Sequence, residues 1–193
     1  MGNLTFGFFS MIIASKATGS NAENFHYFIA AGLCIMLAAV FDGLDGPLAR
    51  LFKSQSQLGE QLDSLADLTT FGLAPGFLMY KIYLYDFVLA KSVLSTPWDI
   101  PIGMAVAAVF PLCAAFRLAR FNVNTAVVDK RYFQGLPSPA AAALVAGFIG
   151  VATDVGVKGY EVAWVMFALA LYAGLTMVTN VPFYSFKDVQ MKK

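Results

Sequence analysis

Apolar residues fall into six long stretches separated by shorter polar segments. The stretches run approximately from Asn3 to Ala17, Phe25 to Phe52, Leu58 to Phe87, Ile100 to Phe121, Pro137 to Thr153 and Tyr160 to Val181. A helix of about 20 apolar residues is long enough to cross the hydrocarbon layer of a membrane. The pattern therefore predicts six membrane-spanning α-helices, with boundaries that the pattern fixes only to within several residues.

Composition agrees with this pattern. Hydrophobic residues make up 59% of the 193 residues and charged residues only 13%, so the chain is far more apolar than a soluble domain of this length. We expect an all-α fold, in which residues 1–193 form one polytopic membrane domain. The first stretch begins almost at Met1, and we expect that its upstream residues are missing from this sequence. No basic run suited to nucleic acid is present.

The Lys and Arg residues are distributed unequally between the two ends of such a bundle. The end that holds the link between the second and third stretches receives nine of them: Arg50, Lys53, Arg117, Arg120, Lys130, Arg131, Lys187, Lys192 and Lys193. The other end receives Lys16, Lys81, Lys91 and Lys158. Positive residues concentrate on cytoplasmic segments. We therefore predict an integral protein of the cytoplasmic membrane, with this link and both termini in the cytoplasm.

Four aspartates flank the link between the second and third stretches. If both flanking segments are helical, Asp42 and Asp45 share one helix face at i, i+3, and Asp63 and Asp67 share another at i, i+4. Like charges brought together in an apolar setting need protons or cations between them. Oxygen-only ligands favour hard ions such as Mg²⁺, Mn²⁺ or Ca²⁺. The spacing predicts a two-metal site at the cytoplasmic membrane surface.

Small residues and a cation surround these acids. Gly46 and Gly59 allow a bulky ligand to approach the backbone, and Ala49 is similarly small. Arg50 is suited to a phosphate. This set of residues favours a metal-bound diphosphate whose phosphorus undergoes in-line displacement. Asp67 lies deepest in the third stretch and is our candidate for the base that activates a hydroxyl nucleophile.

The same stretch resembles a known family signature. Asp42-x-x-Asp45-Gly46-x-x-Ala49-Arg50, then eight residues, then Gly59-x-x-x-Asp63-x-x-x-Asp67 matches the CDP-alcohol phosphatidyltransferases at every fixed position. The resemblance implies a six-helix membrane enzyme in which the four aspartates bind two divalent cations and the last aspartate also acts as the base. We expect Mg²⁺ or Mn²⁺ to serve, with Ca²⁺ as a non-productive occupant. Contacts to the CDP-lipid are implied for Gly46, Ala49, Arg50 and Gly59, with Ser56 as a further candidate.

Motifs outside this signature resemble the phosphatidylserine synthase branch of the family. They are Gly2-Asn3-Leu4, Asp63-Ser-Leu-Ala-Asp67 with Thr70–Pro75, Phe116–Asn122, Gly135–Pro139 and Val181–Lys187. The resemblance implies transfer of a phosphatidyl group from CDP-diacylglycerol to L-serine, which gives phosphatidylserine and CMP. The expected partners are these two substrates and membrane lipids. The sequence leaves open whether the chain forms a homodimer.

The carboxylate of serine requires a cation near the metals. Arg117 and Arg120 lie at i, i+3 near the cytoplasmic end of the fourth stretch, with Asn122 close behind. We predict that one Arg pairs with the serine carboxylate and the other with lipid phosphate. Anchoring of the helix at the membrane interface is the alternative for both. Similarly, Ser56 is compatible with an ordinary loop position, and Gly135–Pro139 with a simple helix start.

Three other interpretations stay open. The acids could be solvated helix ends. The same chemistry could use glycerol phosphate, inositol phosphate or choline as acceptor, or an archaeal ether lipid as donor, as in archaetidylserine synthesis. Acceptors that carry phosphate would require more basic residues than Arg117 and Arg120 supply, which favours serine. Finally, intramembrane carboxylates mark ion pathways, so a divalent cation transporter is the non-enzymatic alternative. The position of the acids at helix ends disfavours it.

Overall fold

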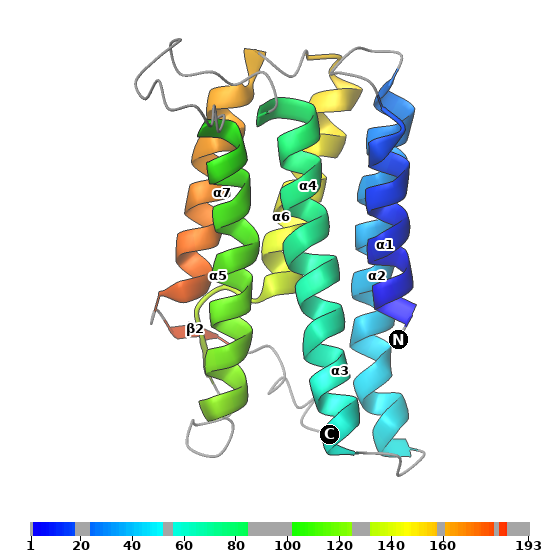
Figure 1. The fold of residues 1–193 in the computed structure, drawn as a ribbon, viewed down its shortest axis with the longest axis vertical. Helices are drawn as coiled ribbons and strands as arrows, with labels where there is room; N and C mark the ends of the chain where they lie inside the picture. The colour runs from blue at the N-terminus through cyan, green and yellow to red at the C-terminus, as the bar shows by residue number, and fades with distance from the viewer. Residues whose placement is uncertain are drawn as a thin grey trace, which may run out of the picture.

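Six helical rods lie side by side along the long axis of the molecule (Figure 1). The structure is a computed structural model that describes residues 2–17, 24–51, 56–84, 102–124, 132–157, 161–179 and 182–184. The rods are α1 (Gly2–Ser15), α2 (Phe25–Leu51), a composite third rod over residues 57–84, α5 (Ile102–Asn124), α6 (Ser138–Asp154) and α7 (Ala163–Val178). Each rod coincides with one apolar stretch, so the predicted helices are confirmed in number and position within the described residues.

The third rod is central to the bundle and is not a uniform α-helix. It consists of α3 (Gln57–Asp67), the π-helical stretch η2 (Leu68–Leu73), α4 (Ala74–Met79) and a second π-helical stretch, η3 (Tyr80–Leu84). Helices α1, α5 and α6 all contact η2, and its three consecutive residues Thr70, Phe71 and Gly72 are buried. Turns of this kind are often found at functional sites, and η2 begins directly after Asp67.

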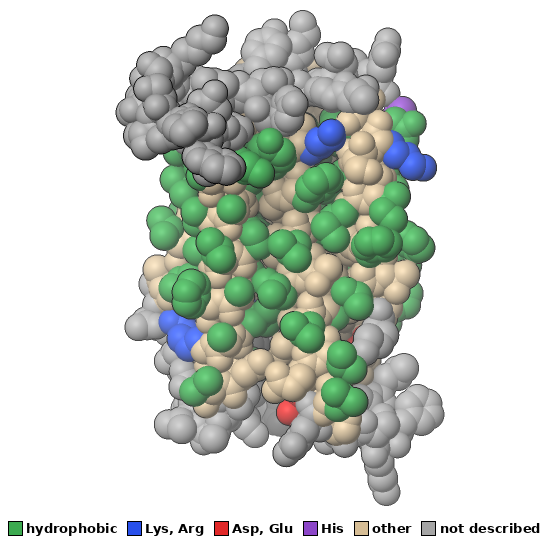
Figure 2. Space-filling view, viewed as in Figure 1, with side chains coloured by type: hydrophobic (Ala, Val, Ile, Leu, Met, Phe, Trp, Pro, Cys, Tyr) green, Lys and Arg blue, Asp and Glu red, His purple; other side chains and the backbone are tan. Residues whose placement is uncertain are grey.

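The outward faces of the rods carry large apolar side chains. Figure 2 shows hydrophobic side chains across the middle of one face of the molecule, and charged side chains towards its ends. Two helical segments within the described residues, Phe25–Asp45 and Gly103–Val123, are long and apolar enough to cross a membrane. Helices α1, α6 and α7 are apolar but shorter. The span count of six therefore stays a prediction.

The face of α1 that packs into the bundle consists of small and polar residues. Asn3, Gly7, Ser10 and Ala14 are its buried residues, and their spacing of three or four places them on one side of the helix. The hydroxyl of Ser10 donates a hydrogen bond of 2.8 Å to the carbonyl of Ala31 in α2. Small residues let helix backbones approach closely, as is usual between membrane helices. As a result, α1 lies close to both α2 and the third rod.

We expect Gly7→Leu to separate α1 from η2. A Cβ atom added at Gly7 would lie 2.8 Å from the Cα of Thr70, which is too close for any side chain. Overpacking of this kind costs about 1–3 kcal/mol of unfolding free energy, so the thermal unfolding midpoint of the detergent-solubilised protein should fall. Gly147→Leu is the matched control, because a Cβ there meets no atom within 4 Å. Equal losses in the two variants would contradict the proposed close approach.

Two short strands were not predicted. β1 (Tyr132–Gln134) pairs antiparallel with β2 (Pro182–Tyr184), with Phe133 opposite Phe183. Strands of three residues have too little local pattern to be recognised, and they form here only by pairing across about 50 residues of chain. The prediction of an all-α fold holds for the six rods but omitted this ribbon, which Figure 1 shows at the end of α7.

The turn after β1 docks on the end of α7. Gly135 has a φ of +79°, and a Cβ there would lie 3.0 Å from the carbonyl oxygen of Thr179, so glycine is required for both reasons. The N–H of Leu136 donates to the carbonyl of Thr176 at 3.0 Å. Helix α6 then begins at Ser138. This supports the simpler interpretation of Gly135–Pro139, in which the segment opens a helix.

Candidate metal centre

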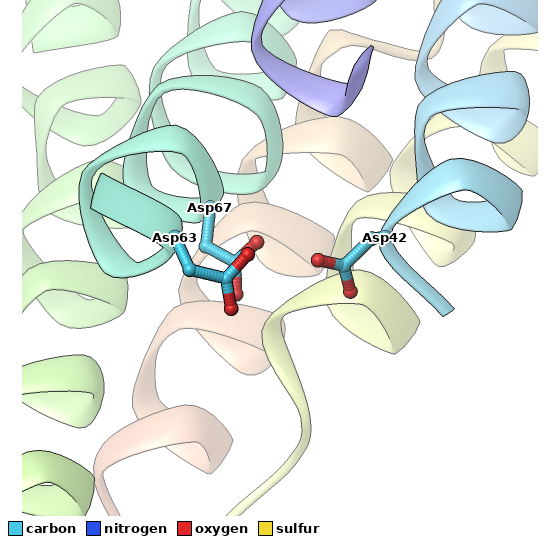
Figure 3. Close-up of side chains that lie close together, drawn as sticks. All are labelled: Asp42, Asp63 and Asp67. Atoms are coloured by element: carbon cyan, nitrogen blue, oxygen red, sulfur yellow. The ribbon is translucent and has the colours of Figure 1, made fainter. Parts of the chain in front are cut away.

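Three aspartates from two rods converge at one end of the bundle. Asp42 lies on α2, and Asp63 and Asp67 lie on successive turns of α3. Each offers a carboxylate oxygen, and these three oxygens all lie within 4.8 Å of one another. Figure 3 shows Asp42 facing the other two across the gap between the helices. Asp42 and Asp67 are half-buried, and Asp63 is exposed.

The fourth aspartate of the predicted site is not part of this group of three. Asp45 is half-buried on α2, one helical turn beyond Asp42. A spacing of three residues rotates it by about 60° around the helix axis relative to Asp42. It is still close enough to Asp63 for the two charges to interact. The structure thus gathers three of the four acids most tightly, with Asp45 beside them.

The start of α3 is fixed by a local cap. Ser56 has an extended backbone, and its hydroxyl oxygen accepts a hydrogen bond of 3.1 Å from the N–H of Gly59. An N-cap serine satisfies one of the free N–H groups at a helix start, so Ser56 has a structural role here. Both residues are exposed. Their predicted contacts with the CDP-lipid stay predictions.

The remaining predicted CDP-lipid contacts are Gly46, Ala49 and Arg50. All three lie in the last turns of α2, in a part of the chain whose side chains are outside the described residues. The structure therefore neither supports nor contradicts their predicted roles.

The electrostatics of the carboxylates favour a bound cation. α3 is the polar part of the third rod. Asp42, Asp63 and Asp67 hold carboxylate oxygens within 4.8 Å of one another. Like charges held this close bind either protons or cations between them. Because the donors are carboxylate oxygens, the set fits a hard divalent ion.

Asn3 joins two of these carboxylates and was not assigned a role from the sequence. Its side-chain Nδ2 donates to Oδ1 of Asp67 at 3.0 Å and to Oδ1 of Asp42 at 3.3 Å. Asn3 is fully buried, and its backbone carbonyl accepts a hydrogen bond of 3.0 Å from the hydroxyl of Thr70. In the sequence, Asn3 stands out only as part of the motif Gly2-Asn3-Leu4. One sequence signal could have pointed to Asn3: it shares a helix face of small and polar residues with Gly7, Ser10 and Ala14.

Arg117 lies beside the aspartate cluster. Its Nη1 donates to the buried hydroxyl of Ser138, at the start of α6, at 2.9 Å. Its charge acts on Asp67. Its Nε is buried and has no hydrogen-bond partner among the described residues. Arg117 therefore has one N–H donor, at Nε, that no described residue uses.

Arg120 and Asn122 make contacts between rods. Arg120 donates from Nη1 to the carbonyl of Val178 at 2.9 Å and from Nη2 to the carbonyl of Thr179 at 3.3 Å. Basic side chains commonly satisfy the last carbonyls of a helix in this way. Nδ2 of Asn122 donates to the hydroxyl of Ser64 at 3.0 Å, which ties α5 to α3. Substrate contacts by these two residues stay predictions.

A comparison with protein families identifies the family of this chain. Residues 2–178 match the family described as CDP-alcohol phosphatidyltransferase. The match covers all six rods, from Gly2 to the end of α7, and includes every aspartate of the cluster. The chain belongs to the CDP-alcohol phosphatidyltransferase family. Within this family, individual curated proteins show further similarity.

Three relatives carry the name CDP-diacylglycerol–serine O-phosphatidyltransferase. The Mycobacterium leprae protein is 30% identical, over 90% of this chain and 56% of its own length. The Helicobacter pylori protein is 34% identical, over 86% of this chain and 65% of its own. The Saccharomyces cerevisiae protein is 37% identical, over 73% of this chain and 48% of its own. This family member thus spans about half to two thirds of the length of these relatives.

Proposed function

We propose that this protein transfers the phosphatidyl group of CDP-diacylglycerol to the hydroxyl of L-serine, which produces phosphatidylserine and CMP. The observation that carries the proposal is the convergence of Asp42, Asp63 and Asp67 within 4.8 Å. It occurs in a member of a family of CDP-alcohol phosphatidyltransferases. The names of the three relatives support serine as the acceptor.

Asp42, Asp45, Asp63 and Asp67 would hold two divalent cations, Mg²⁺ or Mn²⁺. When bound, the cations hold the diphosphate and neutralise charge that develops on the leaving phosphate. The aspartates come from two different rods, so the centre is complete only when α2 and α3 are packed together. Ca²⁺ would occupy the same oxygens without supporting turnover.

Asp67 would act as the general base. It is half-buried next to η2, on the side of the cluster nearest the interior of the bundle. Its carboxylate takes the proton of the serine hydroxyl while the serine oxygen bonds to phosphorus. The bond from phosphorus to the CMP oxygen breaks in the same step, and CMP leaves with that electron pair. Because the aspartates would be committed to cations, we expect direct attack by serine and no covalent enzyme intermediate.

Arg117 would bind the serine carboxylate. A guanidinium offers five donors in a fixed fork. One of these donors is used by Ser138, whereas the buried Nε has no partner among the described residues. Arg50, Gly46, Ala49 and Gly59 would contact the CDP moiety. The engaged donors of Arg120 favour a role in holding α7 over a contact with lipid phosphate.

We further propose that all six rods cross the cytoplasmic membrane, with the metal centre at its cytoplasmic surface. Support comes from the two long apolar helices, the exposed apolar side chains on the outward faces and the unequal distribution of Lys and Arg. This placement lets a water-soluble acceptor meet a lipid-borne donor.

The test is release of CMP by the purified protein given CDP-diacylglycerol and Mn²⁺ or Mg²⁺. L-Serine, glycerol 3-phosphate and inositol phosphate are offered separately. We expect release that requires both serine and the cation and that stops when EDTA is added. Release only with another acceptor would overturn serine as the substrate. Absence of release with every acceptor would overturn the transferase proposal, and Mn²⁺ uptake into sealed vesicles without lipid substrate would then favour a transporter.

A further inference from the structure

We infer that Asn3 is a positioning residue that holds the carboxylates of Asp42 and Asp67 in the arrangement a cation requires. The inference deepens the proposed function, on which it rests for the chemistry of the centre. It concerns three rods at once, because Asn3 lies on α1, Asp42 on α2 and Asp67 on α3. Without a group between them, the charges of the two carboxylates would drive these side chains apart.

The two hydrogen bonds of Asn3 leave room for a cation. Nδ2 carries two hydrogens, and it donates to one oxygen of Asp67 at 3.0 Å and to one oxygen of Asp42 at 3.3 Å. An ionised carboxylate has two oxygens and about four acceptor positions. Each aspartate therefore keeps acceptor positions for a metal while its orientation is fixed from α1. Partners of metal ligands commonly have this effect.

The orientation of the Asn3 amide follows from the carboxylates. Rotating the amide by half a turn would place its oxygen against two carboxylate oxygens. In the observed orientation, Oδ1 of Asn3 is buried and has no hydrogen-bond partner among the described residues. A buried acceptor without a partner is costly, and hydrogen bonds to charged groups are the stronger kind. The Asn3 side chain thus donates to both carboxylates, while its own Oδ1 accepts no hydrogen bond from the described residues.

The backbone of Asn3 is also held. The hydroxyl of Thr70, in η2, donates to the Asn3 carbonyl at 3.0 Å. One turn further along α1, Gly7 permits close approach to the same threonine. The position of Asn3 is therefore set by packing on the third rod, which also carries Asp67. An amide suits this position, because it donates hydrogen bonds without a charge of its own and does not titrate.

The test measures Mn²⁺ binding in the absence of CDP-diacylglycerol and serine. The purified protein in detergent is titrated with Mn²⁺, and the free ion is followed by its electron paramagnetic resonance signal. Asn3→Ala removes the amide, and Asn3→Leu removes it while conserving volume. We expect both to raise the Kd for Mn²⁺ by about 10- to 100-fold. The zero-field splitting of the bound ion should also change, because the carboxylates are held differently.

Ser10→Ala is the matched control. Ser10 is buried on the same face of α1, and its hydroxyl bonds to the carbonyl of Ala31 in α2. It lies about two helical turns from Asn3, so its loss should lower stability and leave Mn²⁺ binding unchanged. Thermal unfolding of all variants checks that each is folded during the titration.

The possible results separate this inference from the proposed function. An unchanged Kd in both Asn3 variants, an equal rise in Ser10→Ala, or no Mn²⁺ binding by the unmodified protein would each overturn the role of Asn3. Mn²⁺ binding that depends on Asn3, without CMP release in the presence of serine, would sustain the inference and overturn the serine transferase. The binding measurement needs no substrate, so neither result depends on the other.

Discussion

Asp67→Asn should lower kcat for CMP release by about 10²- to 10⁴-fold, the usual contribution of a general base. An amide cannot accept the proton of the serine hydroxyl, although it is nearly the same size as the carboxylate. The substitution also removes an anionic metal ligand, so kcat is measured at Mn²⁺ concentrations that saturate the variant. A variant that retains more than a tenth of the original kcat under these conditions would exclude Asp67 as the base.

Asp154→Asn provides the matched comparison. Asp154 is exposed at the end of α6, the opposite end of that helix from Ser138 and the metal centre. The chemical change is identical, and kcat should stay unchanged. A comparable loss in Asp154→Asn would show that the effect of Asp67→Asn is not specific to the cluster.

Arg117→Lys should raise the KM for serine by about 30-fold or more, because losing a partner of a buried charged group costs about 2–5 kcal/mol. A lysine keeps the positive charge but has no planar fork with which to bind a carboxylate and the Ser138 hydroxyl together. KM and kcat are determined separately over a range of serine concentrations. We expect the change mainly in KM, since Arg117 binds the acceptor and does not transfer the proton.

We expect Arg120→Lys to affect stability and not serine binding, unlike Arg117→Lys. Its guanidinium bonds to carbonyls at the end of α7, so its replacement should lower the thermal unfolding midpoint and leave the KM for serine unchanged. If both variants leave that KM unchanged, neither arginine binds the serine carboxylate. If both raise it equally, the division of roles between the two arginines is wrong.

Local spacing made much of the site predictable. Asp63 and Asp67 are four residues apart, so any helix over 57–67 presents them on one side. Asp42 ends up opposite them because a short link forces α2 and α3 to run antiparallel. The position of Asp45 was less predictable. How far α2 is rotated about its axis depends on the packing of the whole bundle, and that rotation decides which of its two aspartates lies closest to α3.

The two arginines illustrate the same limit. Arg117 and Arg120 lie one turn apart on α5 and have equal charge and reach. One lies beside Asp67 and Ser138, and the other lies against the end of α7. Their sequence contexts are alike, because the partners that distinguish them, Ser138 and Val178, lie 21 and 58 residues further along the chain on other rods.

The amino-acid sequence was enough to predict six apolar helices, the end of the bundle that carries the acids, and a group of aspartates suited to a cation. These features depend on periodicity and on contacts between residues a few positions apart, which any helix must obey. Only the packing of the rods brings Asn3 to Asp42 and Asp67, gives Arg117 and Arg120 different partners, and forms the π-helical stretches and the β1–β2 ribbon. Each of these depends on how closely and at what rotation the rods pack. Asn3 reaches Asp67, 64 residues away, only because the small face of α1 lets the helices approach.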